Sequence, residues 1–307
     1  MTNPSNRSAV IRLGISTCPN DTFAFAGLLA RRVDWRGLDF RVELIDIQQL
    51  NDRLLAGDFD IAKTSFHAAL LLAQSCVVLP SGSALGFGVG PLLLAARPDE
   101  SPQSHHQVTL CPGAQTTATM LFEMFYPATC RIEQVVFSEI MPRLTRGAAD
   151  FGVCIHEGRF TWQDQGLALV EDLGSRWERE TGCPLPLGGL VARKRLPSAL
   201  IATAQAVIRD SIDWALSDPD AALPTMRRYA QEFDDDVLMR HVDLYVNDWT
   251  RDLGPVGAAA LAELSTRARA AGILDHRLEL DVFDPQTPDA VGSVTDVPQP
   301  PMNRESE

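Results

Sequence analysis

The chain has 307 residues, of which 45% are hydrophobic and 22% are charged, and its formal net charge is −13. This balance is typical of a globular protein with one large domain or two ordinary ones. The negative charge argues against general binding to nucleic acids or to anionic membrane surfaces, because both attract basic faces. A local pocket of opposite sign can still bind a small anion.

The first half of the chain alternates predicted strands and helices. Short apolar or alternating runs predict the strands, and longer runs that follow turn residues predict the helices. The predicted strands cover 11–16, 40–47, 60–64, 77–79, 108–110, 135–137 and 151–155. The predicted helices cover 21–29, 48–56, 67–74, 116–125 and 139–146. This series is typical of parallel strands joined by right-handed crossovers.

Two segments rich in Gly and Pro, 86–107 and 184–192, interrupt the series and read as crossings between domains. Only helices are predicted after the second crossing, at 198–217, 224–232, 235–246 and 254–271. We therefore predict an α/β protein of two lobes with the ligand cleft between them. Residues 10–97 and 188–278 form the first lobe and 98–187 the second, and we expect 1–9 and 281–307 to be disordered.

A histidine directly follows the predicted strand 151–155. Ligand sites of α/β proteins gather at the carboxyl ends of strands, so His156 is a candidate catalytic residue. An imidazole has an ordinary pKa near ~6.5 and can accept a proton at neutral pH. The alternative, a structural histidine that closes the strand and bonds a carbonyl group, stays open on position alone.

Two strand ends are candidate anion sites. The segment 111–118 joins a strand to a helix, and Thr116 or Thr117 can cap that helix, whose free N–H groups and dipole attract anions. At the end of another strand, Lys63 and Ser65 can present a cation and a hydroxyl group. The alternatives are an ordinary helix cap, and a lysine that reaches solvent beside a capping serine.

The six cysteines are scattered and form no C-x-x-C pair, and no spacing of histidines is typical of a metal site. We therefore expect no metal. The N-terminal segment is polar and lacks a signal-peptide core, and no apolar run is long enough to span a bilayer. We expect a cytoplasmic protein with no membrane partner. Its assembly stays open, with a homodimer as one option.

Five motifs occur in the order found in the 1,4-dihydroxy-6-naphthoate synthase family of the futalosine route to menaquinone, which the chain resembles from about Leu13 to Ala271. The motifs are Ser16–Phe23, Lys63–His67, Gly113–Ala118, Ile155–Thr161 and Leu185–Gly189. The resemblance implies a type II periplasmic-binding-protein-like fold in a cytoplasmic lyase without a cofactor. Such an enzyme converts cyclic dehypoxanthinylfutalosine, a small carboxylate, to the naphthoate and releases the sugar-derived fragment.

The resemblance also implies site residues. The histidine of the I-H-E-x-R-F motif is the proton acceptor of the family, which is His156 in this chain. The substrate contacts of the family fall on Lys63, Thr64, Ser65, Thr116 and Thr117. One departure is Trp162, which stands where the family pattern leads us to expect tyrosine.

We expect His156 to remove a proton from the substrate, with ring opening driven by formation of the naphthalene. We expect Phe23, Phe87 and Trp162 to wall an apolar slot for the ring. His67 is the second candidate for a catalytic histidine. Two alternatives remain: a non-catalytic cytoplasmic binding protein for a small aromatic carboxylate, and the chorismate dehydratase of the same pathway.

Overall fold

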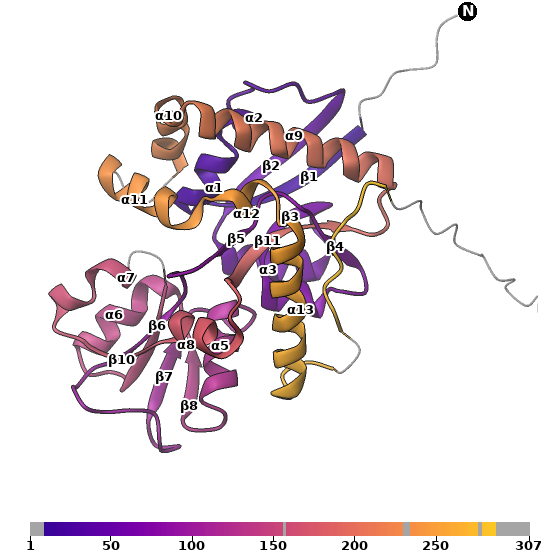
Figure 1. Cartoon of the computed structure of the whole chain (residues 1–307). Helices are drawn as coiled ribbons and strands as arrows, with labels where there is room; N and C mark the ends of the chain where they lie inside the picture. The colour runs from indigo at the N-terminus through magenta and orange to yellow at the C-terminus, as the bar shows by residue number, and fades with distance from the viewer. Residues whose placement is uncertain (1–8, 156–157, 230–233, 276–277, 287–307) are drawn as a thin grey trace, which may run out of the picture.

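Two β-sheets organise the protein in a computed structural model that describes residues 9–155, 158–229, 234–275 and 278–286 (Figure 1). The first sheet has the order β2-β1-β3-β11-β4, with β5 paired to β11, and the second has the order β10-β6-β9-β7-β8. The strands of the first sheet are β1 (Ala9–Ser16), β2 (Leu38–Ile45), β3 (Ile61–Ser65), β4 (Cys76–Val78), β5 (Ala84–Gly86) and β11 (Leu185–Arg193). Those of the second are β6 (Leu92–Ala95), β7 (Val108–Cys111), β8 (Arg131–Gln134), β9 (Phe151–Cys154) and β10 (Ala168–Asp172).

Helices cover both sheets. Those in the first half of the chain are α1 (Pro19–Ala24), α2 (Ala26–Leu29), α3 (Ile47–Ala56), α4 (Phe66–Leu71), α5 (Thr117–Phe125) and α6 (Phe137–Thr145). Those in the second half are α7 (Gly158–Thr161), α8 (Leu173–Thr181), α9 (Ser198–Ser217), α10 (Pro219–Tyr229), α11 (Asp235–Tyr245), α12 (Asp248–Arg251) and α13 (Gly254–Ala270), with a 3₁₀ turn, η1 (Gln163–Gln165). No helix within the described ranges has the length and apolarity needed to cross a membrane.

The parallel pairing predicted from the alternating pattern is found on one side of each sheet. Strand β1 pairs in parallel with β2 and β3, and β7 pairs in parallel with β8 and β9. The strands that arrive after a crossing run the other way: β6 is antiparallel to β9, and β11 is antiparallel to β3 and β4. Both sheets are therefore mixed, which the local sequence pattern did not predict.

The predicted lobe boundary at residue 97 places one strand in the wrong sheet. Strand β6 lies before that boundary, yet it pairs with β9 and β10 in the second sheet. The chain therefore leaves the first sheet between β5 and β6. The second boundary, at residue 188, falls inside β11, which belongs to the first sheet from its start.

Two further expectations need correction. The apolar run 135–137 is no strand: Val136 is 59% exposed and directly precedes α6, and the strand is instead the polar, half-buried edge strand β8 just before this run. In a polar edge strand, the alternation of apolar and polar residues from which strands are predicted is weak. The expected disorder from residue 281 does not hold for 281–283, because Val282 bridges Val78 at the edge of the first sheet.

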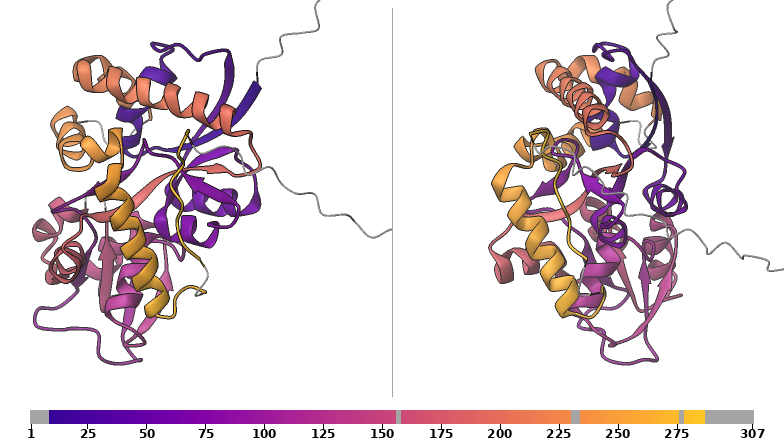
Figure 2. Two further views of the ribbon diagram at one scale, coloured as in Figure 1. Left: turned by 45° about the vertical axis from the view of Figure 1, so that its right-hand side comes forward. Right: turned by 90° about the vertical axis from the view of Figure 1, so that its right-hand side faces the viewer.

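One hydrophobic cluster runs through both lobes. It includes Phe59 and Phe66 in the first lobe and Phe122, Phe151 and Trp177 in the second, all fully buried. Figure 2 shows α13 lying lengthwise along the molecule, and this helix contacts both β11 and α5. The two sheets are therefore packed on a shared core, which holds the residues between them in fixed positions.

Candidate active site

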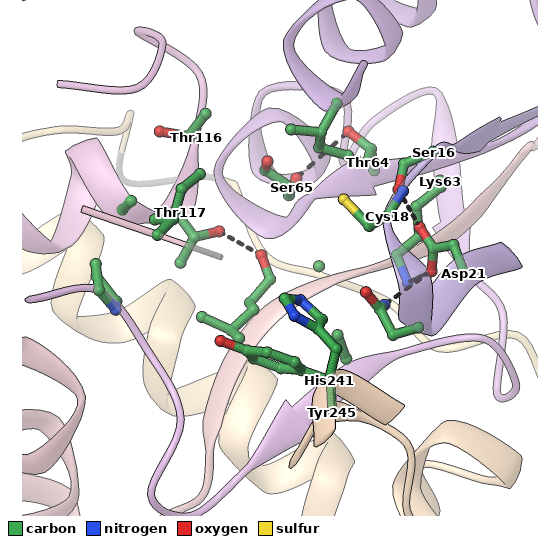
Figure 3. Close-up of a pocket in the computed structure, with 18 residues that line it drawn as sticks. Ser16, Cys18, Asp21, Lys63, Thr64, Ser65, Thr116, Thr117, His241 and Tyr245 are labelled. Atoms are coloured by element: carbon green, nitrogen blue, oxygen red, sulfur yellow. Dashed lines mark hydrogen bonds and ion pairs between the residues drawn. The ribbon is translucent and has the colours of Figure 1, made fainter. Parts of the chain in front are cut away.

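A cavity lies where the two lobes meet, with about 700 Å³ of empty space that is partly open to solvent (Figure 3). It opens at the carboxyl ends of β1, β3 and β9, as expected for ligand sites of α/β proteins. The residues that line it are Ser16, Cys18, Asn20, Asp21, Ile47, Lys63, Thr64, Ser65, Ala84, Pro91, Thr116, Thr117, Ala118, Ile155, Leu187, Gly188, His241 and Tyr245. The five predicted substrate contacts are all among them.

Lys63 forms a buried ion pair rather than presenting an unpaired cation. Its Nζ lies 2.6 Å from Asp21 Oδ1 and donates to the carbonyl oxygen of Gly82 at 2.8 Å. The two side chains are 5% and 3% exposed, and Ser16 Oγ donates to the second carboxylate oxygen of Asp21 at 2.6 Å. The pair is neutral overall. An ammonium has three N–H groups, so the third can point into the cavity.

The predicted helix start at residue 21 is wrong, and Asp21 lies inside helix α1. Helix α1 begins two residues earlier, at Pro19, with Cys18 in the capping position. No local sequence pattern predicts the ion pair, because its two residues lie 42 positions apart on different elements.

A buried asparagine holds Thr64 and Ser65 in place. Asn51 Oδ1, on α3, accepts hydrogen bonds from Thr64 Oγ1 at 2.8 Å and from the Ser65 backbone N–H at 3.0 Å. Asn51 Nδ2 donates to Ser65 Oγ at 3.2 Å, so the hydroxyl proton of Ser65 can be donated to a ligand. Sequence reasoning missed Asn51, and its one signal is a polar residue on the apolar face of an amphipathic helix.

The N-terminus of α5 provides backbone donors. Thr116 Oγ1 caps the helix by accepting from the Thr119 N–H at 3.2 Å, and Thr117 Oγ1 donates to the carbonyl oxygen of Leu187 at 2.6 Å. Both hydroxyl groups are thus used within the protein. The N–H groups of Thr117 and Ala118 belong to the first turn, where a helix offers no acceptor. These two donors and the helix dipole favour an anion in the cavity.

A glycine allows the lobes to approach each other beside α5. Gly113 has φ +117°, in the region that favours glycine, and a Cβ at this position would collide with Gln48 Oε1. Gln48 Nε2, in the first lobe, donates to Gln115 Oε1, in the second, at 2.9 Å. The contact fixes α3 against the turn that leads into α5.

Two cavity residues come from a helix that the sequence analysis left without a role. His241 and Tyr245 lie one turn apart on α11, and both are buried. Their rings lie 4.8 Å apart between centroids, and Phe160 on α7 packs edge-on against His241 with centroids 6.3 Å apart. Figure 3 shows the His241 ring directed into the cavity, between Thr117 on one side and Asp21 on the other.

The predicted proton acceptor His156 lies outside the described residues, so its role stays a prediction. Ile155, directly before it, lines the cavity. Arg159, which follows in the same motif, donates to the carbonyl oxygens of Gly88 and Gly90 and pairs with Asp172 at 2.7 Å. Arg159 thus braces the crossing between β5 and β6 against the second lobe.

The second candidate histidine does not face the cavity. His67 is buried on α4, and its Nδ1 lies 3.4 Å from the carbonyl oxygen of Thr116. Burial lowers the pKa of His67, with a smaller opposing effect from that hydrogen bond. A neutral imidazole at this position supports the turn before α5.

The apolar walls differ from the expected ones. Phe23 packs in a separate cluster with Met226, Phe87 is 52% exposed and contacts Trp249, and Trp162 borders the core behind the second sheet. The expectation that these three aromatic residues wall the slot is therefore wrong, because their backbone positions direct them elsewhere. Among the described residues, the apolar part of the lining consists of Ile47, Ala84, Pro91, Ala118, Ile155 and Leu187.

Comparison with known proteins agrees with this architecture. A protein-family model described as menaquinone biosynthesis matches residues 11–270. The 1,4-dihydroxy-6-naphthoate synthases of Thermus thermophilus and Streptomyces coelicolor are 39% and 37% identical to the chain, over 86% of it and over 95% and 94% of their own lengths.

Solved structures support the predicted fold class. A protein of Archaeoglobus fulgidus is 28% identical, with a TM-score of 0.81, over 89% of this chain and all of its own. The periplasmic aliphatic sulphonate binding protein of Escherichia coli is 12% identical, with a TM-score of 0.60, over 94% and 97%. The periplasmic-binding-protein-like fold is thereby confirmed. With the family match over most of its length, the chain belongs to the menaquinone biosynthesis family.

Proposed function

We propose that this protein is a lyase that converts cyclic dehypoxanthinylfutalosine to 1,4-dihydroxy-6-naphthoate in menaquinone biosynthesis. One observation carries the proposal beyond family membership: segments from three separate motifs, Lys63–Ser65, Thr116–Ala118 and Ile155, line one cavity between the lobes. The relatives that are 39% and 37% identical carry the name of this synthase.

The substrate carboxylate would bind at the N-terminus of α5. A carboxylate can accept hydrogen bonds from the N–H groups of Thr117 and Ala118 and from the hydroxyl group of Ser65, and the helix dipole attracts its negative charge. The aromatic ring would then lie along the apolar lining, beside Leu187 and Ile155. Thr64 and Thr116 would act mainly by holding these donors, because their hydroxyl groups are bonded within the protein.

His156 would act as the general base. Removal of a proton from the substrate opens its ring, and formation of the naphthalene drives the reaction forward. General-base catalysis contributes roughly 10²–10⁴-fold to a rate. His156 directly follows Ile155 in the chain. Because Ile155 lines the cavity, its position supports a catalytic role for the next residue.

We place this activity in the cytoplasm. None of the six cysteines, all of which lie in the described part of the chain, forms a disulfide. Thiols in this state agree with a reducing compartment. Residual attachment to a membrane after cell breakage and washing would contradict this assignment.

The direct test is to incubate the purified protein with the cyclic substrate and follow the absorbance of the naphthoate. We expect product from the unsubstituted protein and turnover reduced at least about 10²-fold in His156→Asn. Turnover should be unchanged in the matched control His106→Asn, an exposed histidine outside the cavity. Substrate binding without product would favour a binding protein. Loss of water from chorismate, without naphthoate formation, would favour the dehydratase.

A further inference from the structure

The cavity has two chemically different ends. At one end, the N-terminus of α5 offers N–H donors and the positive end of a helix dipole, and the described residues that line this end include no acidic side chain. At the other end, Ser16, Asp21 and Lys63 form a hydrogen-bonded cluster that contains both donors and acceptors. Figure 3 shows these ends on opposite sides of the His241 ring.

The two ends attract different ligand groups. A carboxylate accepts hydrogen bonds and carries a charge, so the donors and dipole of α5 favour it. The Asp21–Lys63 pair has no net charge, and the Asp21 carboxylate offers only acceptors. This end therefore gives a substrate carboxylate no comparable attraction. A hydroxyl group both donates and accepts, and it needs no charge to be bound.

The packing of His241 fixes its ring for such a contact. The ring is held between Tyr245 on its own helix and Phe160 from the other lobe. Imidazole nitrogens can donate to or accept from a hydroxyl group, depending on the tautomer. The residue is also buried, so a hydrogen bond to a ligand there competes little with bulk water.

We infer that His241, together with the Asp21–Lys63 cluster, binds the hydroxyl groups of the sugar-derived half of the substrate and so determines which way round the substrate lies. The inference rests on the proposed function. The aromatic carboxylate lies at α5, and the fragment that is released lies against α11 and the end of β1. His241 is thereby a specificity-determining residue for the half of the substrate that does not become the naphthoate.

The test compares two ligands that differ in the hydroxylated half. One is cyclic dehypoxanthinylfutalosine, and the other is 2-naphthoate, an aromatic carboxylate without hydroxyl groups. Equilibrium dissociation constants are measured by calorimetry in the His156→Asn background, which slows turnover. In His241→Phe, which keeps an aromatic ring beside Tyr245, we expect at least about tenfold weaker binding of the cyclic substrate. Binding of 2-naphthoate should change less than about twofold.

Two further variants make the result specific. His241→Gln restores a donor and an acceptor and should recover part of the substrate affinity, which a purely structural role would not predict. Ser65→Ala, at the carboxylate end, should weaken both ligands alike. Retained 2-naphthoate binding shows that each His241 variant is folded.

Either of two results would overturn the inference. These are an equal loss of both ligands in both His241 variants, or unchanged binding of the cyclic substrate in His241→Phe. Failure of the proposed function itself is distinguishable, because the protein without a His241 substitution would then form no naphthoate from the cyclic substrate. That result would remove the basis of the inference as well.

Discussion

Replacing Lys63 with methionine tests the buried ion pair that forms one end of the cavity. The substitution keeps most of the side-chain volume but leaves the Asp21 carboxylate, whose side chain is 3% exposed, without its counter-charge. Removing one partner of a buried pair costs about 3–5 kcal/mol, because an uncompensated charge stays in a poorly solvated site. For a chain of this length we expect the melting temperature to fall by about 5–8 °C. Scanning calorimetry and urea denaturation measure the two quantities.

A double-mutant cycle separates the pair from a general effect on packing. Asp21→Asn should also destabilise the protein, but the double variant should lose at least about 2 kcal/mol less than the sum of the single losses, because neither charge is then buried alone. The matched control is Arg36→Met, which breaks the ion pair with Asp210 at 46% and 40% exposure and should cost at most about 1 kcal/mol. Additivity of the two buried substitutions within about 0.5 kcal/mol would refute the reasoning.

Three further predictions concern the residues around the cavity. Ser65→Ala should raise KM by about 10–100-fold with little change in melting temperature, because one hydrogen bond to a carboxylate is lost; an unchanged KM in steady-state kinetics would exclude Ser65 from the anion site. Gly188→Ala should destabilise the protein by about 1–3 kcal/mol, because the added Cβ would lie 2.6 Å from the carbonyl oxygen of Thr64; denaturation at the wild-type midpoint would contradict the close pairing of β11 with β3. Burial lowers the pKa of His67, so as the pH falls the unfolded chain binds a proton before the folded protein does. The contribution of His67 to the free energy of unfolding is therefore complete above about pH 6.5, and it is lost below that pH by up to about 1.4 kcal/mol per pH unit. In His67→Asn, which can keep a donor toward Thr116, the stability measured between pH 6.5 and 5 should fall less steeply than in the wild type, and identical slopes would show that His67 does not contribute.

Sequence reasoning located the local elements that lead into the site. The apolar run before Ser16 predicts β1, the run before Ser65 predicts β3, and the capping Thr116 predicts the start of α5 within one residue. Hydrophobic period and helix capping depend on neighbours a few residues apart, so the chain itself records them. Where the pattern was weak, at the polar edge strand β8, the prediction failed.

The ion pair, the asparagine support and the second histidine were decided by long-range packing. From the sequence Lys63 is a cation without a known partner until the structure places Asp21 beside it. Asn51 is only a polar residue on the apolar face of a helix until α3 packs against β3. His241 enters the cavity only because α11 returns to the first lobe and packs on α1. A sequence shows which side chains can bond or pair, but not which of many distant partners they meet.

The chain thus encodes its strand-and-helix alternation, the N-terminus of α5 and the motif that contains Ile155 in short stretches that can be read directly. The antiparallel entry of β6 and β11, the meeting of the two lobes and the chemical contrast between the two ends of the cavity arise only in the folded molecule. The physical reason is that local hydrogen bonding and side-chain periodicity act over a few residues. Strand register, burial and charge pairing instead depend on contacts between segments far apart in the chain.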